Sequence, residues 1–329
     1  MNSSESLLIQ LARRFHLDKI GFTSDLIIDK PIPPDDDQNF SWVVDRRFHN
    51  PRLSVPWAKS MVVGIISYYQ DIKNTYNPLH GNVAMYTRGD YYHLLRKKLT
   101  YIAREFKKST GCRISKTYVN GPFNEKEYAR RAGLGYIASN SLLISDQLGS
   151  FTVIGLFLTD ARLENSEIID KSCRLCGQCE LHCPTGALNS GVIDRNKCIQ
   201  ELSQRDLIIP DEIKLHWGNR FYGCDQCQLC CPLNQNLTPQ NHKPLRGVVG
   251  EKVDVYELIK LDPLQIKQKF KGNQMGAGWV SPFALIRNAV LVLSHQKVKL
   301  TGSDLDKLKG YFNPGINDAL TWNQLETSG

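Results

Sequence analysis

The sequence lacks the segments that would carry a protein into or across a membrane. Its first residues, MNSSESLLIQLARRFHLDK, show no basic start followed by a long apolar run, so we expect no secretion signal. No uninterrupted apolar stretch approaches the roughly 18 residues that a membrane-spanning helix needs. Internal repeats and low-complexity tracts are absent as well. We therefore expect a globular protein of the cytoplasm.

The bulk composition is that of an ordinary globular protein. The chain has 329 residues, of which 41% are hydrophobic and 22% are charged, and this length allows more than one domain. The formal net charge is +8, from 41 Lys and Arg residues against 33 Asp and Glu residues. A basic excess of this kind favours an acidic partner such as nucleic acid.

Helical and strand-like segments alternate through the first half of the chain. Helical spacing of apolar residues predicts helices over 5–15 and 90–106, with another helix through Tyr128. β-Branched and apolar runs predict strands over 19–23, 60–69, 113–119, 141–144 and 151–158, and residues 31–39 form a polar loop. This alternation indicates an α/β sheet domain over residues 1–165. Beyond the cysteine-rich segment we expect helices over 253–270 and 282–295, and a weaker one from Ser303.

Nine of the ten cysteines gather in one segment, and only Cys112 stands apart. A disulfide framework would spread its cysteines along the chain, and cytosolic thiols normally stay reduced. The clustering therefore favours metal ligation. A structural zinc site is the alternative, although zinc sites use paired CxxC knuckles and rarely this spacing.

The spacing Cys-x2-Cys-x2-Cys-x3-Cys-Pro, in "CRLCGQCELHCP", is the bacterial ferredoxin run. In two-cluster ferredoxins the fourth cysteine of this run binds the other cluster, so a second, reciprocal run is required. "GCDQCQLCCP" supplies it. We assign one [4Fe-4S] cluster to Cys173, Cys176, Cys179 and Cys231, and the other to Cys183, Cys198, Cys224 and Cys227.

Cys230 competes with Cys231 as a ligand, because two residues separate it from Cys227, as in the Cys-x2-Cys spacing of the first run. The proline that follows Cys231 repeats the Cys-Pro pairing of the first run and favours Cys231. Two oxidised clusters held by thiolates carry about −2 each, which leaves roughly +4 of the formal charge. The basic signal is then modest.

The chain resembles the epoxyqueuosine reductase family, and more distantly the reductive dehalogenases. The likeness runs in order from about residue 5 to about residue 300. It rests on both cysteine runs and on these stretches: "WAKSMVVGIISYY", "YTRGDYYHLLRKKL", "EYARRAGLGYIASNSLLI", "GSFTVIGLFLTD", "GNRFYGCDQCQ" and "PFALIRNAVLVL".

The resemblance implies an oxidoreductase that binds cobalamin beside two [4Fe-4S] clusters. Such enzymes reduce epoxyqueuosine in the wobble position of tRNA to queuosine, with electrons from an external donor such as flavodoxin or ferredoxin. The implied fold is an α/β cobalamin-binding domain over 1–165, a ferredoxin-like two-cluster domain over 166–240 and a short C-terminal helical region over 241–329. The chain has no Asp-x-His-x-x-Gly run, and the family holds its corrin without that histidine ligand.

The resemblance also implies an acid where this chain has none. The family places an aspartate in a turn ahead of the AGLG stretch, and this position falls on Val119, with Asn120 as its polar neighbour. A substitute acid then comes from elsewhere, and Tyr118 and Asp90 are candidates. A family lysine is also replaced, by Ser139. We name Tyr118 and Asn120 as the catalytic candidates.

The remaining site residues are inferred from the same likeness. Arg47, Asn140, Gly149 and Ser150 are candidate corrin contacts, whereas His93 is more often a packing residue. Arg220 and Arg287 are candidate tRNA contacts, although Arg220 could instead offset cluster charge. Further possible RNA contacts are Lys267, Lys269 and Lys271, with Trp217, Phe221 and Tyr222 as stacking platforms or, in the preferred interpretation, core residues.

Three hypotheses remain open at this point. The chain is an epoxyqueuosine reductase with a substitute acid, or a paralogue that reduces another substrate with the same cofactors. The third is an iron–sulfur electron-transfer protein that reduces a corrinoid on a partner.

Overall fold

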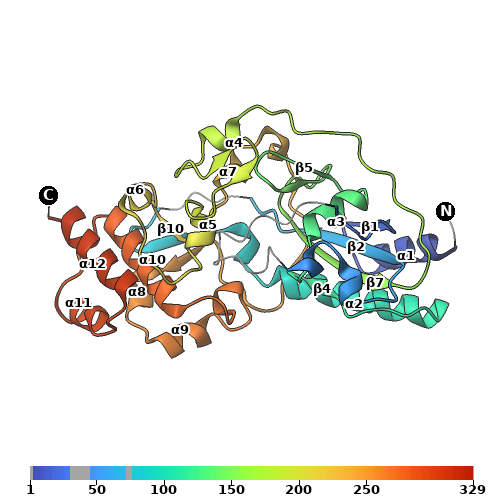
Figure 1. Cartoon of the computed structure of the whole chain (residues 1–329). Helices are drawn as coiled ribbons and strands as arrows, with labels where there is room; N and C mark the ends of the chain where they lie inside the picture. Colours follow the sequence, from blue (N-terminus) through green and yellow to red (C-terminus); the bar gives the residue numbers. More distant parts are fainter. Residues whose placement is uncertain (1–2, 30–44, 72–75, 329) are drawn as a thin grey trace.

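The computed structural model describes residues 3–29, 45–71 and 76–328 (Figure 1). A sheet with its helices lies at the end of the molecule that holds the N-terminus, and a mainly helical part lies at the opposite end. The cysteine module sits between them along one side. The loop predicted over 31–39 lies outside the described residues. In the part of the chain that is described, no helix is long and apolar enough to cross a membrane.

The N-terminal sheet has four strands in the order β1-β2-β7-β4, all antiparallel. They are β1 (Lys19–Thr23), β2 (Ser60–Ser67), β4 (Tyr118–Val119) and β7 (Thr152–Thr159). β2 is buried along its whole length, which explains why its sequence is a nearly continuous apolar run. The expected mixture of helices and strands is confirmed. Their pairing is antiparallel, whereas α/β alternation usually accompanies a parallel sheet.

Helices cover both faces of this sheet. One face packs on α1 (Ser3–Arg14) and α2 (Tyr91–Thr110), and the other on α3 (Glu125–Arg131). The carboxylate of Asp90 caps α2 by accepting from the backbone N–H of His93 at 2.9 Å. Gly111 ends the helix in the left-handed region, with φ at 73°.

The cysteine module consists of short elements joined by turns. They are α4 (Gln178–Leu181), β8 (Leu188–Asn189), β9 (Val192–Ile193), α5 (Ile199–Leu202), α6 (Asp211–Lys214), α7 (Gln226–Leu229) and the 3₁₀ turn η5 (Pro232–Asn234). A separate two-stranded sheet, β5 (Tyr136–Ile137) and β6 (Leu143–Ile144), precedes the module and packs on α3. The helices α4 and α7 carry the two cysteine runs and pack against each other. The two runs therefore meet in space, as the ferredoxin pattern requires.

The C-terminal part is a three-stranded sheet covered by helices. Its strands, in the order β10-β3-β11, are β3 (His80–Val83), β10 (Arg220–Tyr222) and β11 (Lys252–Asp254). Its helices are α8 (Val255–Ile259), α9 (Pro263–Lys269), α10 (Pro282–His295), α11 (Gly302–Lys309) and α12 (Pro314–Glu326). Since β3 belongs to this sheet, the proposed boundaries at residues 165 and 240 do not separate the parts cleanly. Further 3₁₀ turns are η2 (Arg46–Phe48), η3 (Pro51–Leu53), η4 (Met85–Thr87) and η6 (Gln274–Gly276).

Several predicted elements needed correction. The helix expected over 253–270 is broken, because Asp262 caps a new helix at Pro263 with a capping box. Of the strand expected over 113–119, only Tyr118–Val119 pairs in the sheet, as β4, and Ile114 forms an isolated bridge with Thr159. The weak helix expected from Ser303 is α11, and α12 follows it after Pro314.

Arg287 lies inside the C-terminal core and is 1% exposed. Its guanidinium donates to the carbonyl oxygens of Arg205, Leu207 and Leu202 at 2.7, 2.8 and 2.8 Å. The prediction that Arg287 contacts tRNA is therefore wrong. The rings proposed as stacking platforms are also core residues, each 0% exposed: Trp217, Phe221 and Tyr222. Their preferred interpretation as core residues is confirmed.

Replacing Arg287 by Leu should lower the free energy of unfolding by more than about 2 kcal/mol, because several buried carbonyl oxygens lose their donor. Urea unfolding of the variant measures this loss. The exposed Lys269→Gln on α9 serves as the control and should unfold as the wild type does. Unchanged stability combined with weaker RNA binding would return Arg287 to the list of RNA contacts.

Candidate active site

A cavity of about 310 Å³ lies between the sheet and the cysteine module. One wall is apolar and comes from β6 and β7, including Leu143, Val153 and Ile154. The opposite wall holds four of the cysteines: Cys183, Cys198, Cys224 and Cys227. These are the members of the second predicted cluster set, now gathered around one space although they span more than forty residues of sequence.

A buried polar network joins the two walls. The amide oxygen of Asn234 accepts from the backbone N–H of Ser150 at 2.9 Å, and its amide nitrogen donates to the Ser150 hydroxyl at 2.8 Å. The Ser150 hydroxyl in turn donates to the side-chain oxygen of Gln228 at 2.9 Å. All three residues are less than 8% exposed. Since each buried polar group finds a partner, the network fixes the module on the sheet.

Asn140 separates this cavity from a smaller one. It is 2% exposed, and its amide nitrogen donates to the carbonyl oxygen of Cys227 at 3.2 Å. The smaller cavity, of about 20 Å³, is lined by the remaining predicted ligands: Cys173, Cys176, Cys179 and Cys231. The two predicted cysteine sets therefore line two neighbouring spaces that share Asn140.

Cys230 is not among the residues that line the smaller cavity. Its thiol donates to the carbonyl oxygen of Gln178 at 3.4 Å. Burial, followed by the neighbouring Cys179, raises the pKa of the Cys230 thiol to about 11. This placement favours Cys231 as the ligand.

The arrangement of the thiols does not resemble a structural zinc site. Within the described residues, no three Cys, His, Asp or Glu side chains converge as they do around one zinc. Burial, and then the neighbouring thiols, raise the pKa of Cys227, and burial raises the pKa of Cys198. Binding iron as thiolates would therefore release protons and stabilise these buried charges.

The catalytic candidates lie in different places. Asn120, with φ at 54°, lines the larger cavity. Tyr118 is not among the residues that line it, and its ring packs on that of Phe123, with the ring centroids 4.7 Å apart. Asp90 is occupied as the cap of α2 and in an ion pair with Arg246 at 2.8 Å. Neither Tyr118 nor Asp90 is placed to supply the missing acid.

The other predicted contacts are divided in the same way. Asn140 and Ser150 line the cavity, whereas Arg47 is exposed and pairs with Asp45 away from it. Arg220 donates to the carbonyl oxygen of Trp217 at 2.9 Å. Burial raises the pKa of Cys224, and the positive charge of Arg220 partly opposes this rise. This supports the alternative in which Arg220 offsets charge at a cluster ligand.

The sequence interpretation missed both acidic residues of the cavity, Asp225 beside the cysteine Cys224 and Glu125 at the start of α3. An acidic residue in the first turn of a helix is ordinarily explained by the helix dipole, so its position alone gave no sign of a site. The tyrosines on the wall, Tyr68, Tyr86 and Tyr92, were missed as well, because each is a common core residue.

Gly149 shapes the polar network rather than lining the cavity. Its φ is 60°, and a Cβ added there would lie 2.1 Å from the side-chain oxygen of Asn234. Gly149→Ala should therefore displace Asn234 and lower the free energy of unfolding by about 1–3 kcal/mol. Thermal unfolding tests this, with Gly278→Ala, where a Cβ meets nothing within 4 Å, as the control. Equal melting temperatures for both variants would contradict the network's importance.

Two family models match the chain. One, described as a 4Fe-4S double cluster binding domain, matches residues 172–234. The other, described as Epoxyqueuosine reductase QueG, DUF1730, matches residues 49–120. The first agrees with the cysteine module, and it supports two [4Fe-4S] clusters there.

Known proteins resemble the chain over most of its length. The epoxyqueuosine reductase of Bacillus subtilis is 30% identical, over 88% of this chain and 78% of its own length. The epoxyqueuosine reductase of Synechocystis sp. is also 30% identical, over 76% of this chain and 89% of its own length. A crystal structure of an epoxyqueuosine reductase with an epoxyqueuosine-modified tRNA stem loop superposes with a TM-score of 0.84 at 28% identity, covering 99% of this chain and 90% of that one. The chain therefore belongs to the epoxyqueuosine reductase family.

Proposed function

We propose that this protein reduces epoxyqueuosine in tRNA to queuosine, using two [4Fe-4S] clusters and cobalamin. The epoxide loses both C–O bonds and becomes an alkene. Two electrons and two protons are taken up, and the oxygen leaves as water. The electrons come from a low-potential one-electron donor of the flavodoxin or ferredoxin class.

The observation that carries this proposal is the position of the larger cavity. It opens between the sheet and four clustered thiols, so a cofactor held there lies next to the second cluster set. The first set lies on the other side of Asn140, and one of its members, Cys176, is exposed to solvent. Electrons entering at the first cluster would pass to the second and then into the cavity. Short steps between neighbouring centres are what such a relay requires.

The cavity residues fit a corrin. The apolar wall of Leu143, Val153 and Ile154 suits the face of the macrocycle. Among the described residues that line the cavity there is no histidine, in keeping with a corrin held without a protein ligand to cobalt. When bound, cobalamin supplies a low-potential metal centre for reductive cleavage of the C–O bond.

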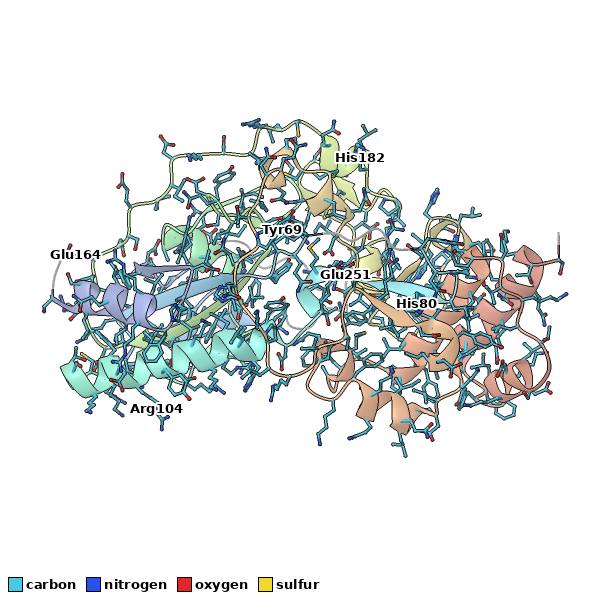
Figure 2. All side chains as sticks on the ribbon, turned by 180° about the vertical axis from the view of Figure 1, so that it is seen from behind. Tyr69, His80, Arg104, Glu164, His182 and Glu251 are labelled. Carbon is cyan, nitrogen blue, oxygen red and sulfur yellow. The ribbon has the colours of Figure 1, made fainter. Side chains whose placement is uncertain are left out.

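The basic surface supports tRNA as the partner. The outer side of α2 carries exposed basic residues, and Figure 2 shows Arg104 pointing away from the sheet. Lys269 and Lys271 are exposed too, whereas the amine of Lys267 is held by the carbonyl oxygens of Ala277 and Val280. Such phosphate contacts give salt-dependent binding without base specificity.

The cluster ligands can be tested by counting iron. Anaerobic reconstitution with iron and sulfide should give about eight irons per chain, and about four would contradict two clusters. Cys231→Ser should lose one cluster, because Cys231 lines the smaller cavity. Cys230→Ser is the matched control and should keep both. The reverse pattern would move the ligand to Cys230.

The reaction can be tested in a single turnover. Reconstituted protein with cobalamin and a chemical reductant should convert an epoxyqueuosine-bearing tRNA stem loop to the queuosine form, as seen by mass spectrometry of the nucleosides. Cobalamin should remain with the protein on a sizing column. Fully reduced cofactors with no product would favour a paralogue with another substrate, and failure to retain cobalamin would favour an electron-transfer protein.

A further inference from the structure

Glu125 brings a carboxyl group to the wall of the larger cavity. Its side chain turns back over the preceding turn, where one carboxylate oxygen accepts from the backbone N–H of Gly121 at 2.8 Å. Asn120, from the same turn, lines the cavity beside it. The carboxyl group therefore stands next to the position at which the family resemblance expects an acid and this chain has none.

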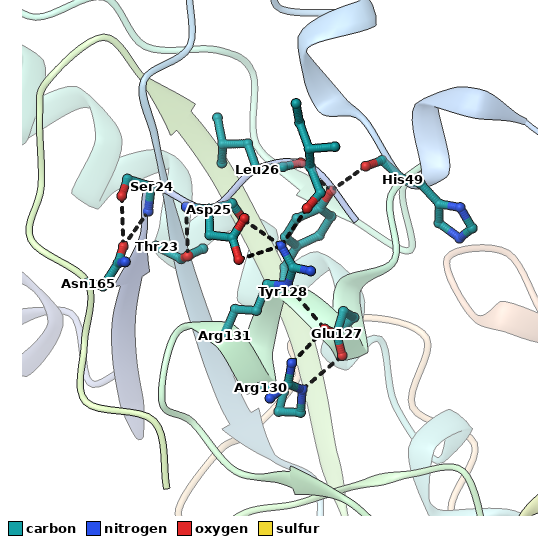
Figure 3. Close-up of polar contacts among 11 residues, drawn as sticks. Thr23, Ser24, Asp25, Leu26, His49, Glu127, Tyr128, Arg130, Arg131 and Asn165 are labelled. Atoms are coloured by element: carbon teal, nitrogen blue, oxygen red, sulfur yellow. Dashed lines mark hydrogen bonds and ion pairs between the residues drawn. The ribbon is translucent and has the colours of Figure 1, made fainter. Parts of the chain in front are cut away.

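The helix that carries Glu125 is anchored on its far side, as Figure 3 shows. The Tyr128 hydroxyl donates to the carbonyl oxygen of Leu26 at 2.8 Å, and Arg131 pairs with Asp25 at 2.7 Å. Arg131 and Arg130 also both bind the carboxylate of Glu127. These contacts fix α3 against the segment that follows β1. Glu125 takes no part in them, so its carboxyl group remains available at the cavity.

Burial raises the pKa of Glu125 to about 8, against the lowering effects of the backbone N–H groups of Gly121 and Asn120 and of Arg96. From α2, Tyr92 and Arg96 face it, and Arg96 donates to the carbonyl oxygen of Val119 at 2.9 Å. The neighbouring amine on its own helix, that of Lys126, donates to the carbonyl oxygen of Ser141 at 2.6 Å. The carboxyl group is therefore protonated at neutral pH.

The other groups on the cavity wall are less suited to give up a proton. Among the described residues that line it, the second carboxyl group is that of Asp225, which accepts from the backbone N–H of Met85 at 2.7 Å and follows the predicted cluster ligand Cys224. Burial raises the pKa values of Tyr86 and Tyr92 well above the ordinary tyrosine value.

Lys126 lines the cavity as well, and burial lowers its pKa, but its amine is held by the carbonyl oxygen of Ser141. Glu125 is the carboxyl group beside the position of the missing acid, and its pKa of about 8 lies near the working pH, as a general acid requires.

We propose that Glu125 is the proton donor to the oxygen that leaves the epoxide, in place of the acid missing at Val119. This inference rests on the proposed function. As the two electrons from the low-potential donor arrive and the C–O bonds break, the oxygen takes one proton from Glu125 and a second from solvent, and departs as water. The Glu125 carboxylate then regains its proton from solvent.

The test is Glu125→Gln in the reconstituted protein. The amide keeps an oxygen to accept from Gly121 but carries no acidic proton. Single-turnover reduction of the modified stem loop should slow by about a hundredfold or more, with stem-loop affinity unchanged within about twofold. Glu212→Gln, at an exposed position on α6 that does not line the cavity, is the matched control and should react at the wild-type rate.

The pH profile gives a second readout. The protonated form of Glu125 is the active one, and it predominates below its pKa of about 8. The wild-type rate should therefore be constant below this pH and fall as the pH rises through it. Glu125→Gln should lose this fall. A variant that reacts at the wild-type rate with the same profile overturns the proposal.

Infrared spectroscopy tests the carboxyl group without turnover. The difference between wild type and Glu125→Gln should show a protonated carboxyl band at pH 7 that disappears above pH 8. Its absence at pH 7 would overturn the proposal. A wild-type protein that converts no epoxyqueuosine contradicts the proposed function itself, whereas normal wild-type turnover with an equally fast variant contradicts only the role of Glu125.

Discussion

The buried amide of Asn234 is the contact on which the arrangement of the site depends. It binds the backbone and hydroxyl of Ser150 on the sheet side, and the carbonyl oxygen of Gln228 in the second cysteine run. A buried network of this kind is strong only when every member is satisfied, so it specifies one docking position. The cavity between sheet and module follows from that position, because its two walls belong to the two partners.

The same docking position also sets how the two cysteine-lined cavities lie relative to each other. Asn140 lines both cysteine-lined cavities and bonds the backbone at Cys227, so the two spaces are close while remaining separate. The ferredoxin crossing places Cys183 with the later cysteines and Cys231 with the earlier ones. Each of the two predicted ligand sets therefore takes cysteines from both runs, and the cavity lies against one of these sets.

Much of this could be predicted from the sequence, for physical reasons that differ by region. The strands β1, β2 and β7 and the helices α2 and α10 were visible because buried runs and helical periodicity are local signals. The cysteine sets could be predicted because cluster ligation constrains the spacing of cysteines.

The membership of β3 in the C-terminal sheet could not be predicted, since its partners β10 and β11 are more than 130 residues away. Glu125 was hidden for a related reason, because its burial depends on the turn at Asn120 and on the module opposite. Arg287 was assigned to a basic face for tRNA, whereas its guanidinium binds buried carbonyl oxygens that lie more than 70 residues away in the sequence.

The central claim is that the cofactor lies in the cavity between the sheet and the second cysteine set. Crystals of the anaerobically reconstituted protein with cobalamin, measured at the iron and cobalt absorption edges, would locate the metals directly. The account predicts iron peaks beside both cysteine sets, and a cobalt peak between Ile154 and Cys198, nearer to the second set. A cobalt peak elsewhere, such as among Asn82, Arg88 and Lys252 in the neighbouring cavity on the other side of Cys224, would contradict it.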